Sequence, residues 1–155
     1  MSTNYRIVVG VDGSDGGRRA LRWAIQEAAA RGGTVQAINA WRWDSFDLPP
    51  HAATHPDQER VRAEETLVRE IESIGDRACV SIASEAVEGR AADVLTAAAR
   101  DADLLALGSH GHSWARHAVL GSVSEECVRK ATCPIVVLPV PQPGPQTHAE
   151  PAVRA

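Results

Sequence analysis

A glycine-rich stretch late in the chain carries residue types suited to binding an anion. Gly108-Ser109-His110-Gly111 is followed, nine residues later, by Gly121-Ser122-Val123-Ser124. Glycines allow a tight turn in which backbone N–H groups face one anion, and a helix starting after Gly121 adds the unpaired N–H donors of its first turn. The Ser122 and Ser124 hydroxyls add possible hydrogen bonds. The spacing predicts a phosphate cradle built without lysine.

Two simpler explanations compete with this cradle. Glycines after strands often serve only turns, and Ser122 with Glu125 fits a capping box at a helix start. Neither the G-x-x-x-x-G-K-S/T loop nor the dinucleotide pattern G-x-G-x-x-G occurs in the chain. The ligand site is favoured because a second glycine-rich turn, Gly10 to Gly17, also follows an apolar run.

Apolar runs alternate with amphipathic patterns along the rest of the chain. Short β-branched or aliphatic runs predict strands at Ile7–Val11, Thr34–Trp41, Cys79–Val87, Asp103–Leu107 and Pro134–Leu138. Helical periodicity predicts helices from the Asp12–Gly17 turn to about Arg31, from Asp57 past Glu72, from Arg90 to Arg100 and from Ser122 to Lys130. In the second helix, Val61, Leu67, Val68, Ile71 and Ile74 are expected to face inward, and the acidic side chains to face solvent.

This alternation predicts an α/β protein with one domain, a three-layer α/β/α sandwich around a parallel sheet. The two glycine-rich turns follow the first and fourth strands, which we therefore place side by side, giving the five-stranded order 3-2-1-4-5. The domain is expected to span 1–140. The Pro-rich segment 141–155 is expected to be a disordered tail, and the long loop 42–56 a lid or partner-facing surface.

Composition excludes several classes of function. The chain has 155 residues, a net charge of -4 and 4% aromatic residues, so neither a basic stripe nor stacking platforms for nucleic acid are expected. Cys79, Cys127 and Cys133 are too few and too scattered for a disulfide framework, which predicts free, buried thiols in a reducing compartment. No segment is apolar enough for a signal peptide or a membrane span, so we expect a soluble, cytoplasmic protein.

The motifs resemble those of the universal stress protein family. Gly10-Val11-Asp12-Gly13-Ser14 after the first strand and the spacing G-x2-G-x9-G-S/T after the fourth are similar to its nucleotide-binding branch. The resemblance covers residues 5–139 and includes the final strand. It implies an adenine nucleotide alpha hydrolase-like fold, ATP as the ligand, with Mg²⁺, and a nucleotide-dependent role in the stress response.

The resemblance also assigns positions one by one. Val11 and Asp12 match the end of the first strand, where Asp12 lies near the adenosine or its metal, and Ala40 matches a backbone contact with adenine. The positions that wrap the ribose and phosphates correspond to Leu107, Gly108, His110 and Gly111. Those that hold the triphosphate correspond to Gly121, Ser122, Val123 and Ser124. Homodimers in the family commonly form through the last strand, here Ile135–Pro139.

Several alternatives stay open at this stage. Asp12 can cap a turn as well as contact a ligand or metal. Arg116 can reach phosphate oxygens or remain solvated, whereas His112 and His117 are expected at the surface. For the whole protein, the alternatives to an ATP-binding sensor with little or no turnover are a slow Mg²⁺-dependent ATPase or phosphotransferase, and a nucleotide-free structural dimer.

Overall fold

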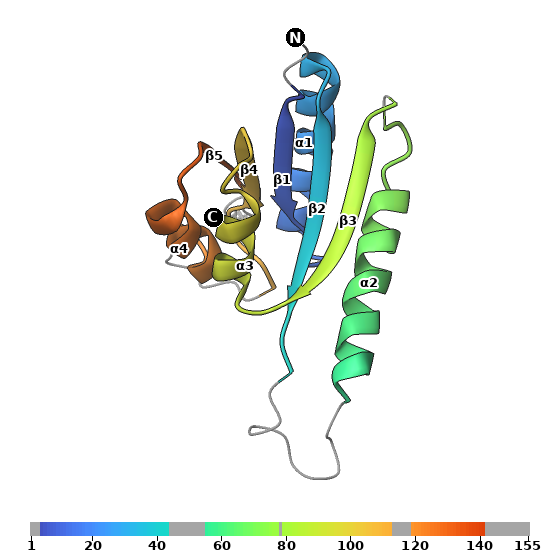
Figure 1. Ribbon diagram of the computed structural model, residues 1–155, viewed down its shortest axis with the longest axis vertical. Helices are drawn as coiled ribbons and strands as arrows, with labels where there is room; N and C mark the ends of the chain where they lie inside the picture. Colours follow the sequence, from blue (N-terminus) through green and yellow to red (C-terminus); the bar gives the residue numbers. More distant parts are fainter. Residues whose placement is uncertain (1–3, 44–54, 78, 113–118, 142–155) are drawn as a thin grey trace, which may run out of the picture.

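The computed structural model describes residues 4–43, 55–77, 79–112 and 119–141. Strands and helices alternate throughout these ranges (Figure 1). In chain order they are β1 (Arg6–Gly10), α1 (Asp15–Arg31), β2 (Thr34–Trp41), α2 (Pro56–Glu72), β3 (Ser81–Glu88), α3 (Ala91–Ala98), β4 (Leu104–Gly108), α4 (Ser122–Lys130) and β5 (Ile135–Leu138).

The strands form one five-stranded parallel sheet in the order β3-β2-β1-β4-β5. Helices α1 and α2 cover one face, and α3 and α4 cover the other. The predicted three-layer architecture and strand order are therefore confirmed. No helix among the described residues is long and apolar enough to cross a membrane.

Successive side chains of the central strands point to opposite faces of the sheet, which creates two separate hydrophobic cores. In β1, Ile7 and Val9 point into the core beneath α1 and α2, and Val8 points into the core beneath α3 and α4. All three are fully buried. Successive strand side chains face opposite sides of a sheet, so a continuous apolar run is what a strand covered on both faces requires.

Element ends differ from the sequence expectations by a few residues. Helix α1 begins at Asp15, inside the predicted turn, because the Ser14 hydroxyl accepts a hydrogen bond from the Gly17 N–H at 3.1 Å and caps the helix. Strand β3 begins at Ser81, because Cys79 lies in a turn with a φ of 59°. The predicted bounds of β2 and α4 are confirmed.

The three thiols are not equally buried. Cys127 is fully buried, and burial raises the pKa of its thiol to about 11. Cys133 is half-buried and Cys79 is exposed. The expectation of free thiols is confirmed, but the expectation that all are buried is wrong for Cys79. Residues 44–54 of the predicted loop and residues 142–155 of the predicted tail lie outside the described part, so the proposed domain boundary stays a prediction.

Helix α2 is rotated relative to the orientation that its apolar residues predict. Leu67 and Ile74 are buried as expected, but Val61 and Val68 are 40% and 52% exposed. The buried face instead includes Glu70, which is 1% exposed. The expectations that both valines face inward and that every acidic residue of this helix faces solvent are therefore wrong.

An ion pair explains why a glutamate occupies this buried position. The Arg18 guanidinium on α1 donates to both Glu70 carboxylate oxygens, at 2.8 and 3.1 Å. Such a two-pronged contact satisfies both oxygens of a desolvated carboxylate. The hydrogen bond from Arg18 holds the pKa of the Glu70 carboxyl below its ordinary value, despite the opposing effect of burial. The pair therefore links α1 to α2 across the face that they share.

We expect Glu70→Gln to lower the free energy of unfolding at neutral pH by about 2 kcal/mol, because Arg18 loses its charged partner. The folded-state pKa of Glu70 is lowered, so its contribution is complete above the ordinary glutamate pKa of about 4.3 and disappears as pH falls through the lowered value. Urea unfolding at several pH values measures this change. The exposed control Glu72→Gln should stay within about 0.5 kcal/mol of wild type. If the difference in unfolding free energy between wild type and Glu70→Gln does not change with pH, the lowered pKa of Glu70 is contradicted.

Candidate functional site

A cavity of about 300 Å³ opens at the carboxyl ends of β1 and β4. The two strands are hydrogen-bonded neighbours, with Val8 opposite Leu105 and Val9 opposite Ala106. Strand order reverses here, since β2 and β3 lie on one side and β4 and β5 on the other. Ligands of open parallel sheets bind at such switch points, and the volume lies at the lower end of the range for small-molecule sites.

Every residue predicted to bind the nucleotide lines this cavity. They are Val11, Asp12, Ala40, Leu107, Gly108, His110, Gly111, Gly121, Ser122, Val123 and Ser124. Gly10, Ser14 and Gly17, which also line the cavity, belong to the glycine-rich turn that the sequence placed at the site, although none was singled out as a ligand contact. The lining residues that the sequence did not place at the site are Ile38, Asn39, Ala91, Leu95 and His112. The strand-end rule could have identified Asn39, next to Ala40. Only tertiary packing brings Leu95 of α3 to the cavity wall.

The absence of a side chain at Gly108 allows α1 to approach β4. A Cβ on Gly108 would lie 2.5 Å from the carbonyl carbon of Gly16 in the first turn of α1. No side chain fits at that distance from backbone. The glycine at the end of β4 therefore lets the start of α1 lie directly against it, and this contact brings the two glycine-rich turns together.

The start of α4 presents backbone donors to the cavity. Gly121 is the N-cap and makes no side-chain capping bond, so Ser122 is the first helical residue and the capping-box alternative is wrong. The Gly121 N–H donates to the Ser109 carbonyl at 2.6 Å, and the first helical bond runs from the Glu125 N–H to the Gly121 carbonyl. The N–H groups of the three residues between them have no hydrogen-bond partner among the described residues. An exposed helix start of this kind attracts anions.

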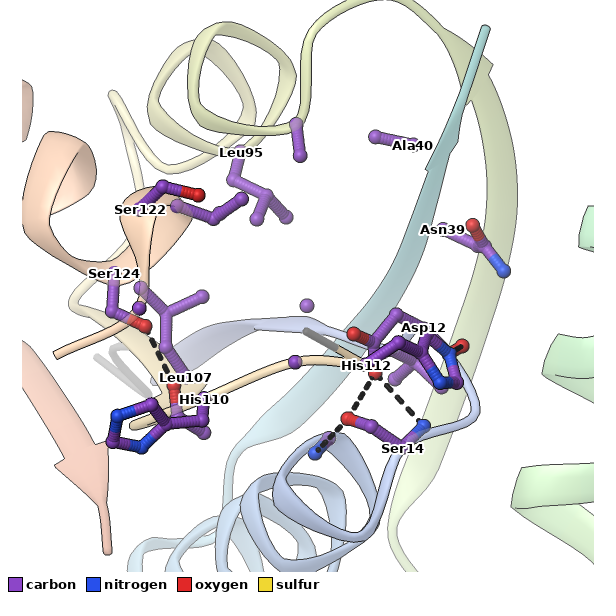
Figure 2. A pocket seen from close by; sticks show the side chains of 18 of the residues that line it. Asp12, Ser14, Asn39, Ala40, Leu95, Leu107, His110, His112, Ser122 and Ser124 are labelled. Carbon is purple, nitrogen blue, oxygen red and sulfur yellow. Dashed lines mark hydrogen bonds between the residues drawn. The ribbon is translucent and has the colours of Figure 1, made fainter. Parts of the chain in front are cut away.

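The two serine hydroxyls of α4 have different surroundings. The Ser124 hydroxyl is buried and donates to the Gly108 carbonyl at 2.6 Å. Its proton is therefore used within the fold, and its oxygen can still accept a hydrogen bond, so its predicted contact with a ligand stays a prediction. Ser122 is exposed at the cavity edge (Figure 2). The Ser124 hydroxyl thus ties α4 to β4, and its backbone N–H is one of the three at the start of α4 without a hydrogen-bond partner among the described residues.

Asp12 combines the two roles that the sequence left open. Its Oδ1 accepts from the Ser14 N–H at 3.0 Å and from the Ser14 hydroxyl, which fixes the β1–α1 turn. The residue is nevertheless exposed and lines the cavity opposite Ser122 and Ser124 (Figure 2). One carboxylate oxygen thus shapes the turn, and Oδ2 has no hydrogen-bond partner among the described residues.

The histidines after β4 occupy contrasting positions. His110 is buried, and its Nδ1 lies 3.0 Å from the Ser109 hydroxyl, with the ring pointing away from Asp12 (Figure 2). His112 is exposed, as expected, but its Nε2 hydrogen-bonds to the Asp12 carbonyl and joins the β4 turn to the β1 turn. Arg116 and His117 lie outside the described residues, so their predicted positions are not tested.

The described cavity wall holds one acidic side chain, Asp12, and neither lysine nor arginine. No group of three or more His, Cys, Asp or Glu side chains suited to hold a metal occurs in the described ranges. Backbone N–H groups and the positive end of the α4 dipole are therefore the main features of the described wall that attract an anion.

Comparison with known proteins places this geometry in a family. The sequence model of the universal stress protein family matches residues 4–139. Universal stress protein Rv2624c of Mycobacterium tuberculosis is 32% identical over 139 residues, covering 88% of this chain and 48% of the relative. A universal stress protein of Mycolicibacterium smegmatis is 32% identical over 135 residues, covering 85% of this chain and 45% of the relative. The chain thus spans about half the length of the curated relatives that it matches.

Two solved structures of similar proteins contain adenine nucleotides. A universal stress protein in complex with cAMP is 26% identical, with a TM-score of 0.65, covering 86% of this chain and 96% of that one. The universal stress protein from Archaeoglobus fulgidus in complex with dAMP is 25% identical, with a TM-score of 0.64, covering 88% of this chain and 98% of that one. The family match covers nearly all of the described residues, and the sheet order and the two glycine-rich turns agree with it. This chain therefore belongs to the universal stress protein family.

Proposed function

We propose that this chain binds an adenine nucleotide, ATP with Mg²⁺, in the cavity at the ends of β1 and β4. It acts as a nucleotide-dependent sensor or regulator in the stress response, with little or no turnover. The observation that carries the proposal is the convergence of three separate chain segments, the β1 turn, the end of β2 and the β4–α4 motif, on one cavity.

The cavity lining includes polar and apolar groups that suit the parts of a nucleotide. The start of α4 offers free backbone N–H groups for phosphates. Ala40, Ile38 and Leu95 form an apolar wall suited to a flat base. Asp12 also lines the cavity, where a carboxylate can accept from ribose hydroxyls. The complexes of family members with cAMP and dAMP support an adenine nucleotide as the ligand.

The Asp12 carboxylate also suits a magnesium ion that enters the cavity together with the nucleotide. Mg²⁺ is commonly held by one or two carboxylates together with phosphate oxygens and water. Asp12 is exposed at the cavity, and its Oδ2 has no hydrogen-bond partner among the described residues. When bound, the ion would neutralise phosphate charge in a wall whose described part lacks lysine and arginine.

The two cavity histidines support binding without rapid hydrolysis. Hydrolysis of ATP requires a group that orients the attacking water. His110 points away from Asp12 and contacts the Ser109 hydroxyl, and His112 contacts the Asp12 carbonyl (Figure 2). Both side chains thus have structural partners, which favours a sensor over the alternative of an ATPase or phosphotransferase.

The proposal includes a homodimer through Ile135–Pro139, at the edge of the sheet. Each residue of β5 is partly exposed, and the strand pairs only with β4 among the described strands. An exposed apolar edge strand invites pairing with a second copy. Sedimentation velocity on the purified chain should give the mass of two copies; the mass of one copy would remove this part of the proposal.

The central test is to denature the purified chain and to identify any released nucleotide by chromatography, followed by calorimetry with ATP, AMP and cAMP. We expect an adenine nucleotide to be released or bound, because the cavity offers both a phosphate cradle and an apolar wall. ADP release with Mg²⁺-dependent turnover would favour the hydrolase alternative. No release and no binding of any of the three nucleotides would leave the structural-dimer alternative.

Gly121→Val should weaken nucleotide binding at least about thirtyfold, by roughly 2 kcal/mol of lost hydrogen bonding. A Cβ at this position would lie 3.3 Å from the Ser109 carbonyl oxygen, so the larger side chain displaces the start of α4 from the cradle. Calorimetry measures the affinity. Gly75→Val is the matched control, because a Cβ there meets nothing within 4 Å. If Gly121→Val binds like wild type, the phosphate cradle is misplaced.

Asp12→Asn separates the turn role of Asp12 from its proposed role toward the metal. The amide oxygen can still accept from the Ser14 N–H, so the unfolding midpoint should change little. With Mg²⁺ present, ATP affinity should fall about tenfold, whereas without Mg²⁺ it should stay equal or rise, because a negative charge has been removed. Calorimetry with and without Mg²⁺ measures both values. Equal losses under the two conditions would argue against a metal contact.

A further inference from the structure

The outer face of α2 carries two valines that the fold leaves unpaired. Val61 and Val68 are 40% and 52% exposed, while the opposite face of the helix packs on the sheet through Ala63 and Leu67. Helix α2 lies at the outside of the molecule beside β3 (Figure 1), and it packs on β2 and β3. Single exposed valines are ordinary, so the arrangement around these two decides whether they matter.

The two valines belong to a regular stripe along the helix. Val61, Glu65, Val68 and Glu72 follow one another at helical spacings of four, three and four residues, which places them on one face. Together with Glu64 and Arg69 they line a shallow groove of about 350 Å³. The groove shares no lining residue with the nucleotide cavity. Apolar and acidic side chains therefore alternate along one exposed face of the helix.

The charges of this stripe are not balanced within the described structure. Glu64 pairs with Arg60 at 2.7 Å, and Arg69 lies 3.6 Å from the buried Glu70. The side-chain carboxylates of Glu65 and Glu72 form no ion pair or hydrogen bond with the described residues. Two unpaired carboxylates thus flank Val68, one turn before it and one turn after it, and give the groove a negative character.

This charge pattern argues against a second copy of α2 as the occupant. Packing two copies of this face against each other would bring together two surfaces that are each lined by three glutamates and one arginine, and an excess of like charges at close range opposes association. A helix with apolar side chains at matching spacing and lysine or arginine beside them would bury both valines and neutralise both carboxylates.

We propose that the stripe Val61–Glu65–Val68–Glu72 on α2 is a docking site for a basic amphipathic helix of a partner protein. The apolar side chains of that helix pack against the valines, and its basic side chains pair with Glu65 and Glu72. Electrostatic complementarity of this kind selects the partner and speeds the encounter, and the valines add the apolar contact. The site is independent of the proposed nucleotide site.

The test uses a fluorescent synthetic peptide of about five helical turns, with leucines along one stripe and lysines on either side. Fluorescence polarisation measures its affinity for the full chain. Glu65→Lys with Glu72→Lys should weaken binding at least about tenfold, because two attractions become repulsions. Val61→Ser with Val68→Ser should weaken it by about tenfold as well. All of these side chains are exposed, and thermal unfolding checks that each variant folds.

The matched control reverses two exposed charges elsewhere, Glu85→Lys with Glu88→Lys on the edge strand β3. This pair should change the peptide affinity by less than about twofold. The proposal is overturned if the control weakens binding as much as the α2 variant, or if a peptide with serine in place of leucine binds equally well. It is also overturned if no binding is seen up to about 1 mM peptide, or if the valine variant dissociates a self-associated wild-type chain.

Discussion

The cavity at the carboxyl ends of β1 and β4 depends on the contact between the start of α1 and the end of β4. Gly16 and Gly108 meet backbone to backbone, at a distance that leaves no room for a Cβ on Gly108. The carbonyl of Gly108 also accepts a hydrogen bond from the Ser124 hydroxyl at 2.6 Å, and this bond holds the start of α4 against the end of β4. The contact therefore positions two helix starts and two turns around one space, with backbone rather than side chains facing its centre.

Cationic side chains hold helices together rather than lining the described part of the cavity. Arg18 joins α1 to α2 through Glu70 on one face of the sheet. On the other face, Arg90 and Lys130 bridge α3 and α4 through Asp93 and Glu126. Lys130 is the only lysine of the chain. Surface pairs are individually weak, but a closed set of four pairs orients the two helices whose starts reach the cavity.

Much of the fold could be predicted because parallel sheets leave a strong signal. Runs such as Ile7 to Val11 are apolar at every position only when both faces of a strand are covered. The glycine-rich turns identified which strands are neighbours, since ligand sites form where strand order reverses. The predicted site residues converge on one cavity because these rules specify where strand ends meet. The sequence also placed both ends of β2 and α4 correctly.

The tertiary structure decided the features that depend on long-range partners. Nothing near Glu70 in sequence predicts its burial, because the compensating arginine lies 52 positions away on another helix. With Glu70 on the buried face of α2, Val61 and Val68 face outward. Likewise, Ser124 is a possible ligand donor in sequence, but its hydroxyl donates to the Gly108 carbonyl. Local pattern determines which residues are apolar, glycine or polar; only packing determines which polar groups are already satisfied, and therefore which remain free for a ligand.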